Sequence, residues 1–218
     1  RRESFPLFSD PVQGNVLRVV PSLDTPGLDP NAVEPPIALE KYYLRYRVST
    51  DGGRTFLFDE PIVAEGFTEA NPFAGVYKGR NGLFMGDVGS QVLRTRDGNI
   101  LIPAQVCTLG EDGKLHSPGG GFTYTDVLIL IGQWRPDHRL TWRTAERIVA
   151  DPARSTRGMI EPTLAETRDG RLLCVMRGSN GGSKDPQFAL PSHKWRSVST
   201  DGGVHWSPPE PWTYDDGT

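Results

Sequence analysis

Long apolar runs and an excess of basic charge are both lacking in this sequence of 218 residues. The longest apolar patch, Val127–Ile131, is the size of a strand, whereas a helix that crosses a membrane needs about 18 or more apolar residues. The 24 Lys and Arg residues are balanced by 27 Asp and Glu residues, so the net charge is −3. Nucleic-acid-binding proteins usually show a basic excess or stripe. The sequence therefore predicts no membrane span and no nucleic-acid partner.

Cysteine is scarce, and metal-binding patterns are missing. Cys107 and Cys174 have neither CxxC spacing nor neighbouring histidines for a zinc site, so we predict that both are buried thiols. The sequence shows no clustered set of His, Asp and Glu ligands, so no metal and no cofactor is predicted. It starts at Arg1 with neither Met nor a signal peptide, as a processed or trimmed product would.

A clear helical pattern is also absent, and turn residues are abundant instead. The 25 glycines and 19 prolines are scattered among short apolar runs, which is typical of an all-β chain. Tyr42–Val48 is predicted to be a strand, and the length fits one domain or a large piece of one. Leu109–Gly121 and Gly178–Ser192 are predicted long loops, and binding groups usually lie on such loops.

One octapeptide is repeated. Ser49–Phe56 and Ser199–Trp206 share the pattern S-x-D-x-G-x-T-W/F, except that His205 replaces the Thr, and Arg135–Trp142 is a degenerate third copy. In such a hairpin turn the Asp carboxylate accepts backbone N–H bonds, Gly takes a positive φ and the closing aromatic packs inward. We therefore predict structural roles for the aspartates and aromatic residues of these turns, which are Asp51, Asp137, Asp201, Phe56, Trp142 and Trp206.

The stretch from residue 157 to residue 177 predicts a second kind of hairpin. Its strands, Thr163–Thr167 and Arg171–Arg177, are joined by the three-residue loop Arg168–Gly170. Counted outward from this loop, Glu161 reaches the position opposite Arg177. A carboxylate and a guanidinium are then expected side by side at the end of the hairpin. They form either a cross-strand ion pair, worth at most about 1 kcal/mol, or part of a functional site.

This hairpin has a sibling in the sequence. Met85–Gln105 superposes on it with a shift of 72 residues, and Gly89 and Gln105 then occupy the positions of Glu161 and Arg177. The sibling keeps the strand pattern without either charged group. If the ion pair were needed merely to hold such a hairpin, the sibling should need it as well. Both interpretations of the pair stay open at this point.

Other candidate site residues follow from their places in the chain. Gln105 and Asp87 are predicted to line a substrate-binding site from the sibling hairpin. His116 and His193 lie in the two long loops and could contact substrate, although a lone loop histidine is more often polar surface. The cations around the first hairpin are expected to be solvated, and they are Arg154, Arg157 and Arg196.

The repeated boxes and the segment EPTLAETRDGRLLCVMR resemble the sialidase superfamily, whose β-propellers carry such Asp boxes. In sialidases a Glu near the start of an inner strand and an Arg sixteen residues later both belong to the catalytic site. The resemblance implies that Glu161 is the base for a tyrosine nucleophile and that Arg177 is one of three arginines that hold the substrate carboxylate. Arg18, in the segment RVVPSL, resembles the family's first arginine in a motif that is one residue longer.

The resemblance also implies a sialidase-type β-propeller, of which residues 1–218 form a part. The repeating units end near Phe56, Trp142 and Trp206, so about three blades are present, or half of a six-bladed propeller. The family's third arginine and its nucleophilic tyrosine belong to later blades, and its acid/base Asp has no recognisable counterpart among Asp24, Asp29 and Glu40. Because three blades cannot close a ring, we expect either self-association or further blades from elsewhere.

The predicted function is therefore an exo-glycosidase acting on a carboxylated sugar, with Glu161 as base and Arg177 as carboxylate binder. The partner is a glycan or an acidic sugar, and the expected location is secreted or periplasmic. One alternative is a sialidase-like propeller that binds glycans without hydrolysis. Another is a polysaccharide lyase acting on uronic acids, because lyases also occur on propellers and also need Arg against a carboxylate.

Overall fold

The protein is described by a computed structural model, which covers residues 7–23, 40–86, 89–121 and 123–213. Every regular element in these ranges is a β-strand, which confirms the all-β prediction. The strands form three antiparallel sheets, and within each sheet the strand order follows the chain. The same ranges hold no helix long and apolar enough to cross a membrane.

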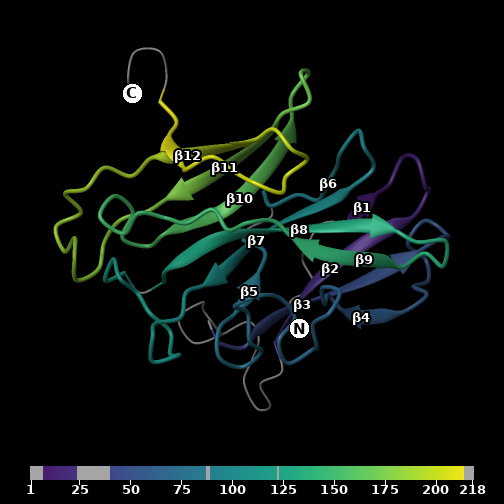
Figure 1. The fold of residues 1–218 in the computed structure, drawn as a ribbon, viewed down its shortest axis with the longest axis horizontal. Helices are drawn as coiled ribbons and strands as arrows, with labels where there is room; N and C mark the ends of the chain where they lie inside the picture. The colour runs from purple at the N-terminus through teal and green to yellow at the C-terminus, as the bar shows by residue number, and fades with distance from the viewer. Residues whose placement is uncertain (1–6, 24–39, 87–88, 122, 214–218) are drawn as a thin grey trace.

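The three sheets are labelled in Figure 1, where the first comprises β1–β4, the second β5–β9 and the third β10–β13. The strands are β1 (Leu7–Ser9), β2 (Val16–Leu23), β3 (Tyr42–Ser49), β4 (Asp59–Pro61), β5 (Leu83–Phe84), β6 (Leu93–Arg94), β7 (Ile100–Cys107), β8 (Thr125–Trp134), β9 (Leu140–Thr144), β10 (Met159–Glu166), β11 (Leu172–Gly178), β12 (Lys194–Ser199) and β13 (Glu210–Pro211).

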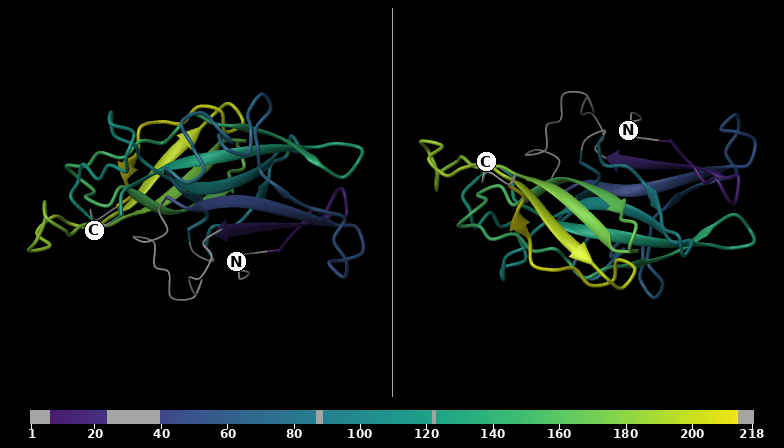
Figure 2. Two further views of the ribbon diagram at one scale, coloured as in Figure 1. Left: turned by 90° about the horizontal axis from the view of Figure 1, so that it is seen from below. Right: turned by 90° about the horizontal axis from the view of Figure 1, so that it is seen from above.

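The second sheet lies between the other two, as the views from below and above also show (Figure 2). Successive side chains of a strand point to opposite faces. On β8, Leu128 and Leu130 join the core shared with the first sheet, whereas Val127, Ile129 and Ile131 join the core shared with the third. All eight residues of β7 are buried. Burial on both faces explains why the apolar run in β8 is continuous rather than alternating.

The first and third sheets each have one covered face and one outward face. Along β11, buried residues alternate with half-buried or exposed ones, and Leu173, Val175 and Arg177 point outward. On β3 the outward residues are Tyr43, Arg45 and Arg47. Arg45 and Arg47 both bond to Asp59 of β4, at 2.6 and 3.0 Å. The outward faces therefore mix apolar and charged groups.

The two cysteines are buried thiols, as predicted. Cys107 and Cys174 are both free, 1% and 0% exposed, and lie on β7 and β11. Burial disfavours the thiolate and raises the pKa of Cys107 to about 12, and the pKa of Cys174 is raised for the same reason. Neither thiol has the lowered pKa that a reactive cysteine needs.

Two of the repeated boxes form the predicted turns. The Asp51 carboxylate accepts the N–H groups of Thr55 (2.9 Å) and Arg54 (3.0 Å) and the hydroxyls of Thr55 and Ser49 (both 2.7 Å). These hydrogen bonds, led by those from Thr55, hold the pKa of Asp51 at about 2. Asp201 repeats the pattern, with the ring Nδ1 of His205 in place of the Thr hydroxyl, at 2.6 Å.

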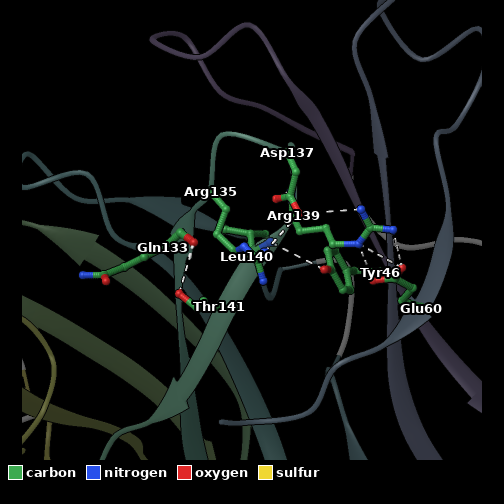
Figure 3. Close-up of polar contacts among 8 residues, drawn as sticks. All are labelled: Tyr46, Glu60, Gln133, Arg135, Asp137, Arg139, Leu140 and Thr141. Atoms are coloured by element: carbon green, nitrogen blue, oxygen red, sulfur yellow. Dashed lines mark hydrogen bonds and ion pairs between the residues drawn. The ribbon is translucent and has the colours of Figure 1, made fainter.

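The degenerate third box forms a turn of a different kind, shown in Figure 3. Asp137 accepts the N–H of Arg139 at 3.2 Å, but Thr141 donates its hydroxyl to the carbonyl of Gln133 instead of to Asp137. The guanidinium of Arg139 reaches across to the first sheet and binds both oxygens of Glu60, with Nη2 to Oε1 at 2.9 Å. This degenerate turn, which lacks the Ser and Gly of the regular boxes, thus links the first and second sheets.

Boxes and long loops lie at opposite ends of the strands. In Figure 1 the loops at residues 108–121 and 179–193 gather on the left, whereas the box turns of the first two sheets lie on the right. In the third sheet Ser199, at the end of β12, begins the box, whereas Lys194, at its start, pairs with Arg177. The box aspartate Asp201 therefore follows the end of β12 that is opposite to the end paired with Arg177.

A pH-dependent contribution to stability is expected from His205. Its hydrogen bond and charge attraction to Asp201 raise its pKa above 6.5. A raised pKa means that this bond stabilises the fold fully below pH 6.5 and that the contribution is lost as the pH rises through the higher folded-state value. His205→Thr restores the box pattern of Thr55, whose bond does not titrate in this range.

Melting temperatures of the wild-type chain and His205→Thr should therefore be compared between about pH 6 and about pH 8. The wild type should lose stability relative to the variant as the pH rises. Parallel curves for the two proteins would contradict the role assigned to the imidazole.

Candidate functional site

The hairpin of β10 and β11 has the predicted three-residue loop. The N–H of Thr167 donates to the carbonyl of Arg171 at 2.8 Å, and the N–H of Gly170 donates to Thr167 at 3.1 Å. The ladder then runs regularly from Glu166, opposite Leu172, outward. The turn chemistry of the segment R-D-G was therefore sufficient to predict the local register.

A β-bulge interrupts this ladder before it reaches Arg177. The predicted pairing of Glu161 with Arg177 is wrong by one residue, because Ile160 is the ladder partner of Arg177. Register is lost between Ile160 and Thr163, where Pro162 has no N–H to donate and Glu161 has a φ of +53°. The bulge places the backbone of Glu161 in the left-handed region, which residues other than Gly rarely adopt.

The predicted contact between the two side chains is nevertheless present. Nη1 of Arg177 donates to Oε1 of Glu161 at 2.8 Å. The side chains are 52% and 34% exposed, so the pair lies at the surface and is accessible to a solute. An exposed ion pair contributes at most about 1 kcal/mol to folding. Stability is therefore a weak reason for this arrangement.

Gln105 supports the bulge from the neighbouring sheet. Its Oε1 accepts the backbone N–H of Glu161 at 2.8 Å, and its side chain is buried on β7. Its Nε2 donates to the hydroxyl of Thr125 at 3.4 Å, and that hydroxyl donates to the carbonyl of Met159 at 2.8 Å. The residue predicted to line a substrate site thus holds the backbone of Glu161 in place.

Gly86 is a second support that the sequence did not reveal. A Cβ built on Gly86 would lie 2.7 Å from the Cα of Glu161 and 2.6 Å from Oε1 of Gln105. No side chain fits there without displacing one of them. The proposed superposition of the hairpins also needs correction here, because Phe84, not Gly89, is the ladder partner of Gln105. The inner strand of the second sheet is interrupted between β5 and β6, which a constant shift of 72 residues cannot represent.

Arg157 is closer to the pair than predicted. Its side chain was expected to be solvated, but the residue is half-buried, with Nε donating to the hydroxyl of Thr123 at 3.0 Å and Nη1 to that of Ser179 at 3.4 Å. Burial lowers the pKa of Arg157, and repulsion from Arg177 lowers it further. Attraction to Glu161 raises this pKa and so partly offsets the other two effects. No local pattern in the sequence indicated this burial, because both partners lie in other segments of the chain. Arg154 and Arg196 are exposed, as predicted.

The other predicted site residues are spread more widely. Asp87 lies outside the described residues. His116 is exposed in the loop at residues 108–121. His193 is half-buried directly before β12, and its carbonyl accepts the N–H of Gly178, the residue after Arg177, at 2.9 Å. Of the two predicted histidines, His193 is therefore the one that the ladder brings to the end of β11.

Arg18 has a different setting. It lies on β2 opposite Arg47, two residues from Val16, and Val16 pairs with Ser49 of the first box. Arg18 is thus near the box end of its sheet, whereas Arg177 lies at the loop end of its own. Of the acid/base candidates, Asp24 and Asp29 lie outside the described residues, and Glu40 pairs with Lys41 at 3.7 Å.

The local charge suits a small anion. Arg177 bonds to Glu161, and among the described residues Arg157 is a second guanidinium close enough for its charge to interact with both. A guanidinium binds a carboxylate through two parallel hydrogen bonds. The described residues contain no cluster of three or more His, Cys, Asp and Glu side chains that could hold a metal ion.

Comparison with known structures shows the fold. A protein of unknown function from Dyadobacter fermentans has a TM-score of 0.56 and 16% identity over 94% of this chain and 49% of its own. A Hadza microbial sialidase has a TM-score of 0.54 and 18% identity over 93% of this chain and 32% of its own. The chain thus spans about half and about a third of these two proteins.

Two comparisons address the sequence itself. No curated protein matches it. A family model described as BNR repeat-like domain matches residues 36–216, which include both regular boxes and the candidate site. The chain therefore belongs to the BNR repeat-like domain family and has a sialidase-like fold.

Proposed function

We propose that the chain carries part of the active site of an exo-glycosidase that acts on a carboxylated sugar. In this proposal Arg177 binds the sugar carboxylate and Glu161 is the base that activates the nucleophile. The observation that carries it is the strained backbone of Glu161, which is held by a buried glutamine of another sheet and directed at an exposed arginine.

The ion pair by itself gives the strained backbone no net stabilisation. A residue other than Gly in the left-handed region costs about 1 kcal/mol, which is as much as an exposed ion pair returns. Strain of this kind persists only where the surroundings impose it, and it is concentrated at functional sites. Gln105 and Gly86 are those surroundings here.

The chemistry of the two groups fits an acidic sugar. Arg177 bonds to Glu161 through Nη1, and at 52% exposure its guanidinium stays within reach of a ligand. The half-buried Arg157 adds positive charge beside it and strengthens attraction for an anion. The carboxylate of Glu161 can accept a proton from a nucleophile.

The proposal includes the architecture of the whole site. We infer that the three sheets are three blades of a six-bladed propeller. The outward faces of the first and third sheets then pack against further blades or a second copy, with the loop end of β11, where Arg177 lies, left open. The family resemblance assigns the tyrosine nucleophile and the third arginine to such blades. A secreted or periplasmic location would give the protein access to glycans.

Relief of the backbone strain can be measured directly. Glu161→Gly and Glu161→Ala remove the same carboxylate, but only Gly accepts a φ of +53° freely, so Glu161→Gly should be more stable by about 1 kcal/mol. At Glu166, on the same strand, the regular ladder should make the Gly variant the less stable of the two. Urea unfolding of all four variants would test this, and the same order at both positions would contradict the strain.

The catalytic roles predict losses of activity without loss of fold. In the full-length protein, Glu161→Gln should lower kcat by orders of magnitude, because the base is lost. Arg177→Lys should raise KM for an acidic sugar, because the bidentate grip is lost while the charge stays. Both variants should change the stability by about 1 kcal/mol or less. The assay is release of N-acetylneuraminic acid from a fluorogenic α-glycoside.

The turn of the same hairpin supplies a matched control. Arg171 and Asp169 form an ion pair at 2.8 Å with 55% and 56% exposure, so Arg171→Lys and Asp169→Asn repeat the chemistry at the far end. These variants should keep full activity. Full activity of Glu161→Gln would contradict the role of Glu161 as base. Glycan binding by a wild type that releases no sugar would favour the binding propeller. Release of an unsaturated uronic acid from a uronic-acid polysaccharide, identified by ultraviolet absorbance and mass spectrometry, would favour the lyase.

A further inference from the structure

The loop at residues 179–193 carries a large apolar side chain into solvent. It leaves β11 after Arg177 and Gly178 and returns to β12 at Lys194, the ladder partner of Arg177. In Figure 1 it extends beyond the ends of these strands, on the left. Phe188 of this loop is 73% exposed. An exposed phenyl ring gains little from folding, so its presence here needs another explanation.

The conformation of Phe188 is also unfavourable. Its φ is +52°, in the left-handed region that bulky residues avoid. The ring lies against Gly181, because a Cβ built there would approach Cε1 of Phe188 to 2.7 Å. A side chain at residue 181 would therefore displace the ring. Strain and exposure at one residue are the combination expected of a ligand contact.

Buried polar groups hold Phe188 in this conformation. The Asp185 side chain is 4% exposed, and its Oδ1 accepts the N–H groups of Ala189 at 2.6 Å and Leu190 at 3.4 Å. The N–H of Phe188 donates to the carbonyl of Asp185 at 3.1 Å. A buried carboxylate thus organises the turn around the ring, which limits the entropy that ligand binding would cost.

Neighbouring segments fix the loop further. Asn180 is 6% exposed, donates to the carbonyl of Pro191 at 2.9 Å and accepts the N–H of Thr156 at 2.8 Å. The N–H of Ser183 donates to the carbonyl of Gly120, in the other long loop, at 2.9 Å. The loop is therefore anchored to the segment before β10 and to the loop after β7. These hydrogen bonds preorganise the loop.

A cleft of about 240 Å³ is lined by Leu190 and Pro191 of the same loop, and Phe188 lies outside its lining. Its polar groups are Arg154 and His193, and the Arg154 guanidinium stacks over Trp195 at 4.6 Å. The remaining lining residues are Ala153, Leu190, Pro191 and Trp195. Apolar walls with a few fixed polar groups are typical of small-ligand sites.

We propose that this loop is a second sugar subsite, in which the Phe188 ring stacks on the C–H face of a neutral pyranose. The negative face of an aromatic ring suits C–H groups, and the cleft offers donors for hydroxyls. The pyranose belongs to the glycan whose acidic sugar binds at Arg177, so the assignment of the glycan rests on the proposed function. The stacking contact itself requires only the neutral sugar.

Three probes separate the two sites: N-acetylneuraminic acid, lactose and sialyllactose, each titrated by NMR into the full-length protein. Phe188→Ala and Phe188→Leu should weaken sialyllactose and lactose binding about five- to tenfold, and Phe188→Tyr should restore it. Binding of N-acetylneuraminic acid should not change. Arg177→Lys should weaken binding of N-acetylneuraminic acid and sialyllactose and leave lactose binding unchanged.

Phe67 is the matched control, since its ring is 39% exposed on another loop, and Phe67→Ala should leave all three affinities unchanged. If lactose binds and depends on Phe188 while N-acetylneuraminic acid does not bind, the proposed function fails and the subsite stands. Unchanged sialyllactose and lactose affinity in Phe188→Ala, or no binding of either by the wild type, would overturn the subsite. A variant that changes only self-association, measured by light scattering, would assign the ring to a protein contact and also overturn it.

Discussion

Strands β7 and β8 send apolar side chains to both faces of the second sheet, so this sheet needs a covering layer on each side. Each fully buried Leu, Ile or Val contributes about 1.5–3 kcal/mol, and the interior of these strands consists mainly of such residues. The first and third sheets cover these two faces, and each of them buries one of its own faces in doing so. The relative placement of all three sheets follows from this shared burial.

The candidate site depends on the same packing. Gln105 lies on a strand whose residues are all buried, and a buried amide without partners costs about 1–3 kcal/mol. It finds those partners in the N–H of Glu161, across the interface with the third sheet, and in the hydroxyl of Thr125 on the neighbouring strand β8. The bulge of β10 thus satisfies a core amide of β7 and, by the same bond, orients Glu161 toward Arg177. Packing and site geometry are not separable here.

Much of this architecture could be predicted from the sequence because its signals are local. The boxes carry their own hydrogen-bonding groups, and the R-D-G loop sets its own register. The bulge could not be predicted, because it depends on Gln105, 56 residues away, as well as on Pro162. The burial of Arg157 depends on Thr123 and Ser179, which approach from two other segments. Such contacts between distant segments leave no periodic pattern in the chain.

Gly86 has a consequence for how this protein can vary. It lies so close to the Cα of Glu161 and to Oε1 of Gln105 that even a methyl group needs one of them to move. Substitutions at these three positions should therefore be strongly epistatic: a change at one alters which residues the other two tolerate. Sequences that drift at Gly86 would be expected to change at residue 161 or 105 together with it. Covariation of residues 86, 105 and 161 among related sequences would therefore identify this contact between the two sheets.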